Sequence, residues 1–282
     1  MLFENAFAGA EHQPFLLRAG NGAAALLVHG FPGTPAEMRP LGEALHAAGW
    51  TARGLLLPGF GSDIGSIDRR RFEDWQGAVI KAAGELRRSH NRLLLIGNSM
   101  GGALAISAAA ACSADGLVLL NPFWELESPL WKLLPVLSRV FRQIKPFGLV
   151  RMNFDDRETR EGILKFMPDA DLDDPQVQQA IREFAIPTGI FAQIRRAGLA
   201  GHKAAAALAE RKIPALVLQG DGDELVKPIK TRALAARLGA TYRELPGAHD
   251  LPDPRSAGWA TVRATVLEFA ATLPQAQGAN HV

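Results

Sequence analysis

The chain has 282 residues, of which 48% are hydrophobic and 21% charged, a length and composition that suit one large globular domain or a core with an insertion. Lysine and arginine number 31 against 29 aspartates and glutamates, so the formal net charge is +2 and the basic excess expected of a nucleic-acid-binding protein is missing. Cys112 is the only cysteine, which excludes a disulfide within the chain and a thiolate metal cluster.

The first part of the chain alternates short apolar runs with longer amphipathic segments. The short runs predict strands that are buried on both faces, and the amphipathic segments predict helices that cover a parallel sheet. The expected strands are residues 24–28, 50–57, 93–96 and 117–120, and the expected helices are residues 35–48, 72–88 and 101–112.

This alternation stops at Asn121-Pro122. The pattern is then mostly helical, with no convincing strand, until it resumes with strands over 215–219 and 241–245 and helices over 229–238 and 256–273. The sequence therefore predicts an α/β core formed by residues 1–122 and 209–282, interrupted by a helical insertion over 123–208. Because the insertion follows a strand, we expect it at the carboxyl end of the sheet, where open α/β sheets bind ligands.

The segment Gly97-Asn98-Ser99-Met100-Gly101 lies between a predicted strand and a predicted helix, which is the context of the G-x-S-x-G pattern. Glycines are needed there because a side chain on either side of the serine would collide with backbone in the tight turn. The turn would expose the Ser99 hydroxyl at a helix N-terminus, where free N–H groups favour developing negative charge. Ser99 is the candidate nucleophile, and the alternative is a serine that only caps the helix.

A serine nucleophile needs a base, and the base needs an orienting carboxylate. Among seven histidines, His249 lies on a glycine-bearing loop after a predicted strand, downstream of the other motifs, and is the candidate base; the alternative is a solvated loop histidine. Residues 220–226 follow another strand and offer Asp221, Asp223 and Glu224. Asp223 matches a Gly-x-x-Asp-x-x-Val spacing and is preferred, with Asp221 in reserve. The order Ser, Asp, His along the chain is the order in which proteins with the G-x-S-x-G turn carry these three residues.

Acyl transfer also needs N–H donors for the oxyanion. The segment His29-Gly30-Phe31-Pro32-Gly33 ends the first clear strand. We expect one donor to be the backbone N–H of Phe31 and the other that of Met100, since Pro32 has none. The alternative is a simple Pro-Gly turn, and His29 is expected to shape this turn rather than to act in catalysis.

Taken in this order, the motifs resemble those of the α/β-hydrolases, and within them the bacterial carboxylesterase and monoacylglycerol lipase group. The resemblance extends through residues 26–33, 38–61, 92–105, 217–226 and 247–250. It implies an eight-stranded, mostly parallel sheet, a helical cap and a serine hydrolase mechanism without a cofactor. One departure is Phe60, where many relatives have histidine in a loop at the entrance. The acidic residues within 169–174 indicate a solvated turn rather than a metal site.

The start of the insertion, residues 123–147, places apolar side chains at helical spacing with basic residues between them. This pattern fits a lid over an acyl pocket, a face that touches lipid surfaces transiently, or a cap helix packed on the core. The candidate substrate-binding residues are Phe123, Trp124, Leu130, Trp131 and Leu134.

The primary hypothesis is a serine hydrolase for carboxylic esters of short to medium acyl chains, with monoacylglycerol as the specific candidate. Its expected partner is the small ester, with no nucleic acid. One alternative is carbon–carbon bond hydrolysis of a diketone by the same triad, with Arg151, Arg195 and Arg196 binding a substrate carboxylate. A further alternative is a non-catalytic small-molecule binding protein on a hydrolase scaffold.

The sequence also gives an expectation of location. Residues 1–20 lack a basic segment followed by an apolar run, and no stretch approaches about 18 uninterrupted apolar residues, so neither a signal peptide nor a transmembrane helix is predicted. Together with the single cysteine, this predicts a cytoplasmic protein.

Overall fold

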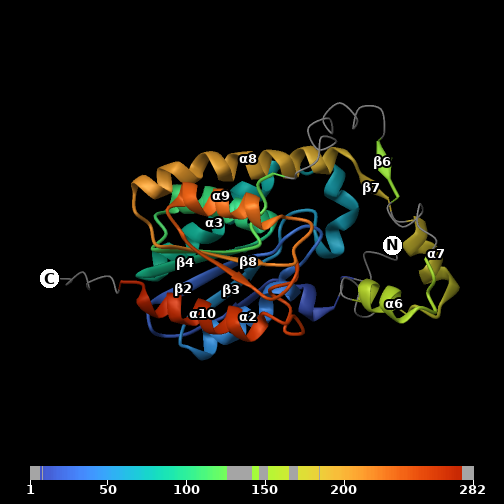
Figure 1. Ribbon diagram of the computed structural model, residues 1–282, viewed down its shortest axis with the longest axis horizontal. Helices are drawn as coiled ribbons and strands as arrows, with labels where there is room; N and C mark the ends of the chain where they lie inside the picture. The colour runs from blue at the N-terminus through green and yellow to red at the C-terminus, as the bar shows by residue number, and fades with distance from the viewer. Residues whose placement is uncertain are drawn as a thin grey trace.

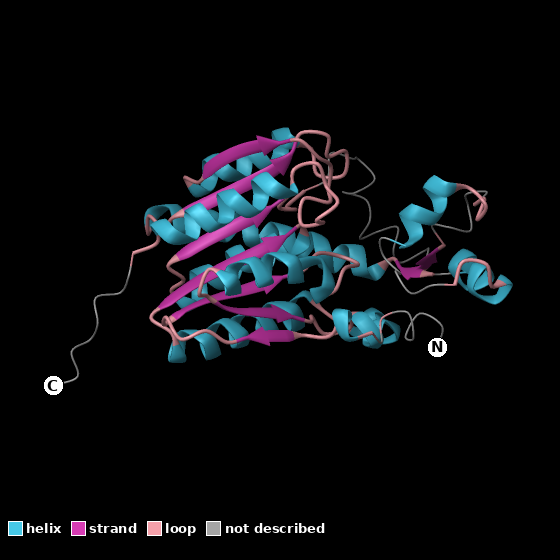
Figure 2. Ribbon diagram, turned by 90° about the horizontal axis from the view of Figure 1, so that it is seen from below, coloured by secondary structure: helices cyan, strands magenta, loops and turns pink. Residues whose placement is uncertain are grey.

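The centre of the molecule is a seven-stranded sheet with the strand order β1-β3-β2-β4-β5-β8-β9 (Figures 1 and 2). The computed structural model describes residues 7, 9–125, 142–145, 152–164, 171–183 and 185–274. All neighbouring strands of the sheet are parallel except β1 and β3, so the expected α/β class with a mostly parallel sheet is confirmed. The strands are β1 (Phe15–Leu17), β2 (Ala23–Val28), β3 (Thr51–Leu55), β4 (Arg92–Asn98), β5 (Gly116–Leu120), β8 (Ala215–Gly220) and β9 (Thr241–Leu245).

Helices cover both faces of this sheet (Figure 1). One face packs against α2 (Pro35–Ala47) and α10 (Trp259–Thr272). The other packs against α3 (Phe72–Ser89), α4 (Met100–Cys112), α8 (Gly189–Glu210) and α9 (Pro228–Leu238). Neighbouring residues of one strand are buried in different clusters, because successive side chains of a strand point to opposite faces. This is why the strands are continuous apolar runs.

The resemblance implied an eight-stranded sheet, whereas the main sheet of the described residues has seven strands. Ahead of β1, the described chain forms the 3-10 helix Ala10–His12 instead of a further strand. A second 3-10 helix, Gly61–Arg69, joins β3 to α3. Among the described residues, no helix has the length and apolar character needed to cross a membrane.

The insertion contains α6 (Arg157–Leu164), α7 (Pro175–Glu183) and a short antiparallel pair formed by β6 (Gln143–Ile144) and β7 (Ile186–Pro187). The expectation of no strand between 123 and 208 was therefore wrong in this detail, because two-residue strands are too short to show a period of two. Around α6 and α7 a small separate cluster is buried, made of Phe154, Ile163, Leu172 and Ile181. The parallel strands point toward the side of the molecule that carries these elements (Figure 2).

The long helix α8 lies within the predicted insertion but packs as part of the main body. Its residues Ile190, Ile194, Ala197 and Ala205 belong to the same buried cluster as α3, α4 and the strands. It lies so close to α4 that a Cβ at Gly201 would be 2.7 Å from the Ala103 carbonyl oxygen. The boundary between core and cap at residue 208 stays a prediction.

Candidate active site

Ser99 makes the turn between β4 and α4 by itself, since β4 ends at Asn98 and α4 begins at Met100. Its backbone has φ 51° and ψ −119°, a conformation that residues other than glycine rarely adopt and that costs about 1–3 kcal/mol. Besides the bond from the Gly102 N–H in the first turn of α4, two hydrogen bonds tie its backbone to the region of β5: the Ser99 N–H donates to the Leu120 carbonyl at 2.9 Å, and the Phe123 N–H donates to the Ser99 carbonyl at 3.0 Å. The end of β5 thus fixes the serine.

The two glycines of the G-x-S-x-G segment are required by close backbone contacts. A Cβ at Gly97 would lie 2.3 Å from the Gly101 carbonyl oxygen, and a Cβ at Gly101 would lie 2.3 Å from the Val28 carbonyl oxygen. Both distances are far below any real carbon–oxygen contact. The first turn of α4 therefore lies directly on the backbone of β2 and β4, for the steric reason that the sequence indicated.

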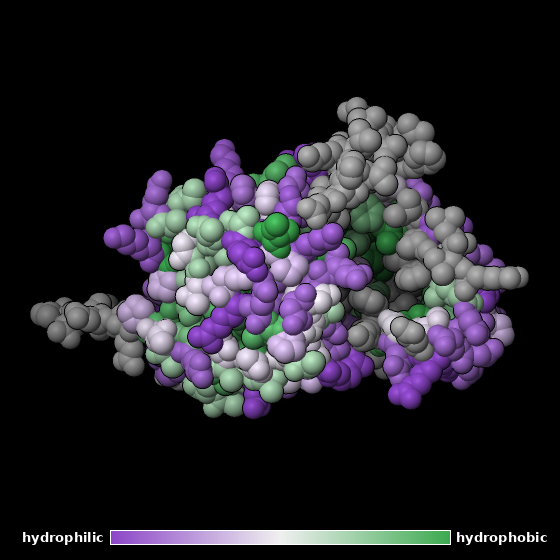
Figure 3. All heavy atoms as spheres, in the orientation of Figure 1, coloured by the Kyte–Doolittle hydropathy of each residue, from purple (hydrophilic) through white to green (hydrophobic). Residues whose placement is uncertain are grey.

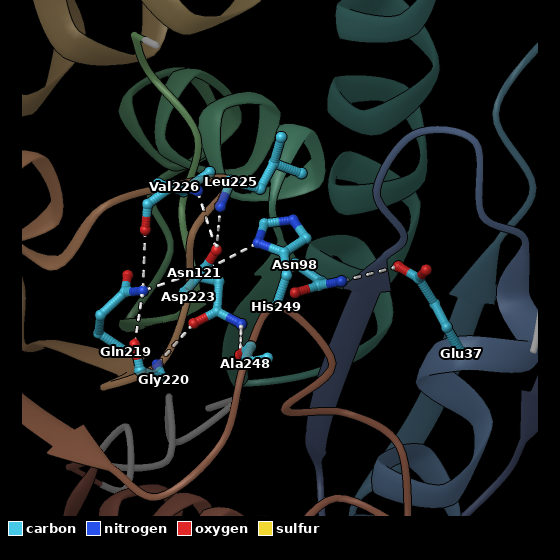
Figure 4. A network of polar contacts seen from close by, with 10 residues as sticks. All are labelled: Glu37, Asn98, Asn121, Gln219, Gly220, Asp223, Leu225, Val226, Ala248 and His249. Carbon is cyan, nitrogen blue, oxygen red and sulfur yellow. Dashed lines mark hydrogen bonds and ion pairs between the residues drawn. The ribbon is translucent and has the colours of Figure 1, made fainter. Parts of the chain in front are cut away.

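Asp223 and His249 are brought together from two loops at the carboxyl end of the sheet (Figure 4). The Asp223 Oδ2 accepts a hydrogen bond from the His249 Nδ1 at 2.7 Å, and the same oxygen accepts one from the Gln219 Nε2 at 3.2 Å. Its Oδ1 accepts the backbone N–H groups of Leu225 and Val226, both at 2.9 Å. This buried carboxylate is thus held by three groups besides the histidine, and its direction is fixed.

The reserve candidate, Asp221, lies elsewhere. It is exposed, and its Oδ1 accepts the Gly247 N–H at 3.2 Å instead of a histidine. The amide of Gln219, which donates to Asp223, is buried and also donates to the carbonyls of Gly220 at 3.1 Å and Val226 at 3.0 Å. These bonds close the loop that holds Asp223.

Asn121 links the acid loop to the histidine loop. Its side chain is fully buried; its Oδ1 accepts the Gly220 N–H at 2.8 Å, and its Nδ2 donates to the Ala248 carbonyl at 3.1 Å (Figure 4). Ala248 directly precedes His249. Asn121 has φ 43°, a left-handed conformation that asparagine tolerates better than most residues. One amide therefore holds both loops against the end of β5, beside the strand that carries Ser99.

The structure does not join Ser99 to His249 by a hydrogen bond. The His249 Nε2 is buried and has no hydrogen-bond partner in the described part of the chain. Asp223 holds the opposite nitrogen, so Nε2 is the ring atom left for a further group. Bonds of this kind are often long in unliganded enzymes and tighten when substrate binds.

The two predicted oxyanion donors belong to segments next to Ser99: Met100 follows it in the chain, and Phe31 follows Gly30, which lies against it. Neither the Phe31 N–H nor the Met100 N–H has an acceptor within the described residues. The loop of Phe31 lies against the serine, because a Cβ at the neighbouring Gly30 would be 3.1 Å from the Ser99 Cβ. The Phe31–Pro32 peptide bond is cis. The Phe31 ring lies edge-on to those of Phe60 and Phe191, at centroid distances of 6.0 and 6.1 Å.

His29 and Phe60 form the floor behind this loop. The His29 ring accepts the Leu57 N–H at Nε2 (3.1 Å) and bonds the Gly30 carbonyl through Nδ1 (2.8 Å), so it shapes the turn as expected. Burial lowers the pKa of His29 to about 4, and the ring is neutral at physiological pH. Phe60, at the position where many relatives were expected to have histidine, is fully buried and packs edge-on to His29 and Trp75.

The predicted substrate-binding residues fall into two groups. Phe123 is buried next to Ser99, and Trp124 stacks on His202 at 4.2 Å and donates its indole N–H to the Lys230 carbonyl at 2.9 Å, so contacts with α8 and α9 fix it. Leu130, Trp131 and Leu134 lie outside the described residues. A substrate role for all five stays a prediction.

Sequence reasoning missed Glu37, Asn98, Asn121 and Gln219 as members of the site. Asn98, Asn121 and Gln219 share a detectable feature: each is a polar residue at or just after the carboxyl end of a buried apolar strand. Glu37 gave no such signal, because an acidic residue in the first turn of a helix is ordinary.

A mostly parallel sheet with a serine on a strained strand-to-helix turn, and a carboxylate-bound histidine on later loops at the same edge, defines an α/β-hydrolase. Residues 21–250 match the family model described as Serine aminopeptidase, S33, and the chain belongs to this family.

Comparisons with individual proteins agree with this fold. A thermostable monoacylglycerol lipase from Bacillus sp. (strain H-257) is 41% identical over 101 residues, a match that spans 36% of this chain and 39% of the relative's own length. A structure from work on LipS and LipT, two metagenome-derived lipolytic enzymes, superposes with a TM-score of 0.70 at 21% identity over 93% of this chain and 98% of the other. The monoacylglycerol lipase of Paleococcus ferrophilus superposes with a TM-score of 0.66 at 20% identity over 93% and 99%.

Proposed function

We propose that the chain is a serine hydrolase that cleaves carboxylic esters through an acyl-enzyme on Ser99. The main supporting observation is the 2.7 Å bond between the His249 Nδ1 and the Asp223 Oδ2, which leaves the buried His249 Nε2 without a partner in the described part of the chain. A histidine held in this way presents an acceptor nitrogen and has a carboxylate ready to stabilise its cation.

In this mechanism the Ser99 Oγ attacks the ester carbonyl carbon while the His249 Nε2 accepts the hydroxyl proton. The carbonyl oxygen becomes an oxyanion and accepts the N–H groups of Phe31 and Met100. The tetrahedral intermediate collapses as His249 protonates the leaving alcohol. Water then attacks the acyl-enzyme with His249 again as base, and the acid is released as Ser99 regains its proton.

For the substrate we propose an ester of a short to medium acyl chain, with monoacylglycerol as the specific candidate. The relative with 41% identity is a monoacylglycerol lipase. In the space-filling view the molecule is hollowed between the main body and the part that carries α6 and α7, and hydrophobic residues are visible within the hollow (Figure 3). A transient contact of the cap with lipid surfaces and a cytoplasmic location are further parts of this proposal.

Carbon–carbon bond hydrolysis gains no support from Arg196. Arg196 forms an ion pair with Glu73 and lies over the Phe72 ring, so its charge is already paired at the surface. Arg151 lies outside the described residues.

The test is covalent labelling with a fluorophosphonate probe, followed by kinetics on p-nitrophenyl and glycerol esters from acetate to palmitate. Wild type should be labelled at Ser99, and Ser99→Ala should lose labelling and at least about 10⁴-fold of kcat. Ser107→Ala is the matched control, because this buried serine lies on α4, the helix that Ser99 precedes, and its hydroxyl donates to the Ala103 carbonyl at 3.1 Å. A folded wild type that the probe does not label would support a binding protein. Preference for an aminoacyl anilide or a diketone over every ester would also overturn the proposal.

A further inference from the structure

Glu37 is a carboxylate beside the site that the mechanism above does not use. It lies in the first turn of α2, behind the loop formed by residues 29–33. Its Oε1 accepts the Gly30 N–H at 2.5 Å and the Asn98 Nδ2 at 3.2 Å. Figure 4 shows the contact between Asn98 and Glu37. Asn98 directly precedes Ser99, so one oxygen of Glu37 joins the loop of Phe31 to the strand that leads to the nucleophile.

The loop also closes around the second oxygen of this carboxylate. A Cβ at Gly33 would lie only 2.1 Å from the Glu37 Oε2, so the backbone of Gly33 rests directly against it. Glu37 therefore contacts both ends of the segment that contains Phe31. The contact is built from backbone and from a side chain of the neighbouring strand, and the carboxylate is enclosed by them.

These contacts bear on the direction of the Phe31 N–H. That N–H belongs to the same planar peptide as the Gly30 carbonyl and points the opposite way. The Gly30 carbonyl bonds the His29 Nδ1 at 2.8 Å, and the Gly30 N–H bonds Glu37. Both polar groups of Gly30 are therefore held. A glycine without these bonds has a wide choice of φ and ψ, and the following N–H would turn with it.

The electrostatic surroundings of the Glu37 carboxyl group reflect the same contacts. Burial raises the pKa of Glu37, and the bonds from Gly30 and Asn98 and the charge of His249 oppose this effect. Glu37 is thus within electrostatic range of His249, and in Figure 4 it lies on the opposite side of that ring from Asp223.

We propose that Glu37 is a positioning residue that fixes the Gly30–Phe31 peptide so that the Phe31 N–H points to the developing oxyanion. The inference rests on the proposed function, since an oxyanion forms only if Ser99 attacks a carbonyl. On this inference the direction of the Phe31 N–H depends on the position of the acceptor oxygen of Glu37 and not on its negative charge.

Two conservative substitutions separate reach from charge. Glu37→Gln keeps an acceptor oxygen at the same distance along the side chain and removes the charge, so kcat should stay within about threefold of wild type. Glu37→Asp keeps the charge and withdraws the oxygens by one methylene, so kcat should fall about 10²-fold, the usual cost of misplacing a catalytic group by about 1 Å. KM should change less than about threefold in both, because the bond acts on the transition state.

A boronic acid inhibitor, whose boron becomes tetrahedral when Ser99 adds to it, gives a second readout. Its affinity should fall with kcat in Glu37→Asp and stay near wild type in Glu37→Gln. Glu43→Gln is the control, since Glu43 is exposed on the same helix and should behave as wild type. If Glu37→Asp is not recovered folded, Glu37→Met keeps the length without an acceptor and should show the same loss.

Three outcomes overturn the inference: an impaired Glu37→Gln with an active Glu37→Asp, losses confined to KM, or no loss in any variant. Failure of the probe to label wild-type Ser99 overturns the proposed function instead.

Discussion

Asn121→Ala should destabilise the protein and slow catalysis together, because one buried amide holds the loops of both Asp223 and His249. The substitution leaves the Gly220 N–H and the Ala248 carbonyl without the partners that now lie at 2.8 and 3.1 Å. Asn121 is fully buried, so water does not readily replace the lost amide.

The magnitude follows from these contacts. Each buried group left without a partner costs about 1–3 kcal/mol, and alanine at φ 43° adds roughly 1 kcal/mol of left-handed strain. We therefore expect the free energy of unfolding to fall by about 3–7 kcal/mol. For a chain of this size each kcal/mol lowers Tm by about 2–4 °C, so Tm should fall by at least about 6 °C. The freed His249 loop should lower kcat/KM about tenfold or more.

Thermal unfolding and ester kinetics on the same preparation measure both effects. Asn153→Ala is the control, since that exposed side chain only accepts the Asp155 N–H at 3.1 Å and should change Tm little. Asn121→Asp keeps the shape and the acceptor for Gly220 but turns an oxygen toward the Ala248 carbonyl. Its deficit in stability should shrink as the pH falls and the introduced carboxyl gains a proton to donate. A Tm for Asn121→Ala within about 2 °C of wild type would refute the reasoning.

Two further predictions concern the floor of the site and its turn. Burial lowers the pKa of His29 to about 4, so the stability due to its neutral ring is fully present above about pH 6.5 and is lost, by about 3 kcal/mol, as the pH falls to about 4. Urea unfolding across this range should show that slope in wild type and a weaker one in His29→Gln, and equal slopes would contradict it. Gly97→Ala should prevent folding because its Cβ would lie 2.3 Å from the Gly101 carbonyl oxygen, whereas Gly77→Ala, with no atom near its Cβ, should stabilise α3 by roughly 0.5–1 kcal/mol. Circular dichroism and denaturant midpoints check the pair, and a stably folded Gly97→Ala would count against the steric argument.

The sequence predicted the central strands well because burial on both faces leaves a continuous apolar run. Boundaries were less accurate where the strand ends in a polar residue: the run at 93–96 extends in the structure to Asn98, as β4. The edge strand β1 was missed because it has only three residues, of which Leu16 is exposed. The packing of α8 on α4 was missed because helical periodicity shows that a face is buried but not what buries it.

The predicted site residues were found by motif, and the residues that support them were not. Ser99, Asp223 and His249 occupy short patterns whose spacing is informative along the chain. Glu37 acts across it, on Asn98, at a separation of 61 residues that no local pattern records. Gln219 lies only four residues before Asp223, but that spacing belongs to none of the motifs that the sequence offered. Gln219 is also hidden within an apolar strand, where a single amide looks like an interruption.

The strand order explains why the three amide side chains that the sequence analysis missed lie at the same edge of the sheet. Asn98 ends β4, Asn121 follows β5 and Gln219 is next to last in β8, and these strands are neighbours in the sheet. Where a parallel ladder ends, the loops that leave it carry backbone groups that have lost their strand partners but stay buried, and such groups need other partners. All three amides donate a side-chain N–H, and Asn121 also accepts one, so these residues hold neighbouring segments together without adding charge beside a histidine. Once the order β4-β5-β8 is known, a buried amide at the carboxyl end of each strand marks the edge where loops must be held most firmly, which is the edge that carries Ser99, Asp223 and His249.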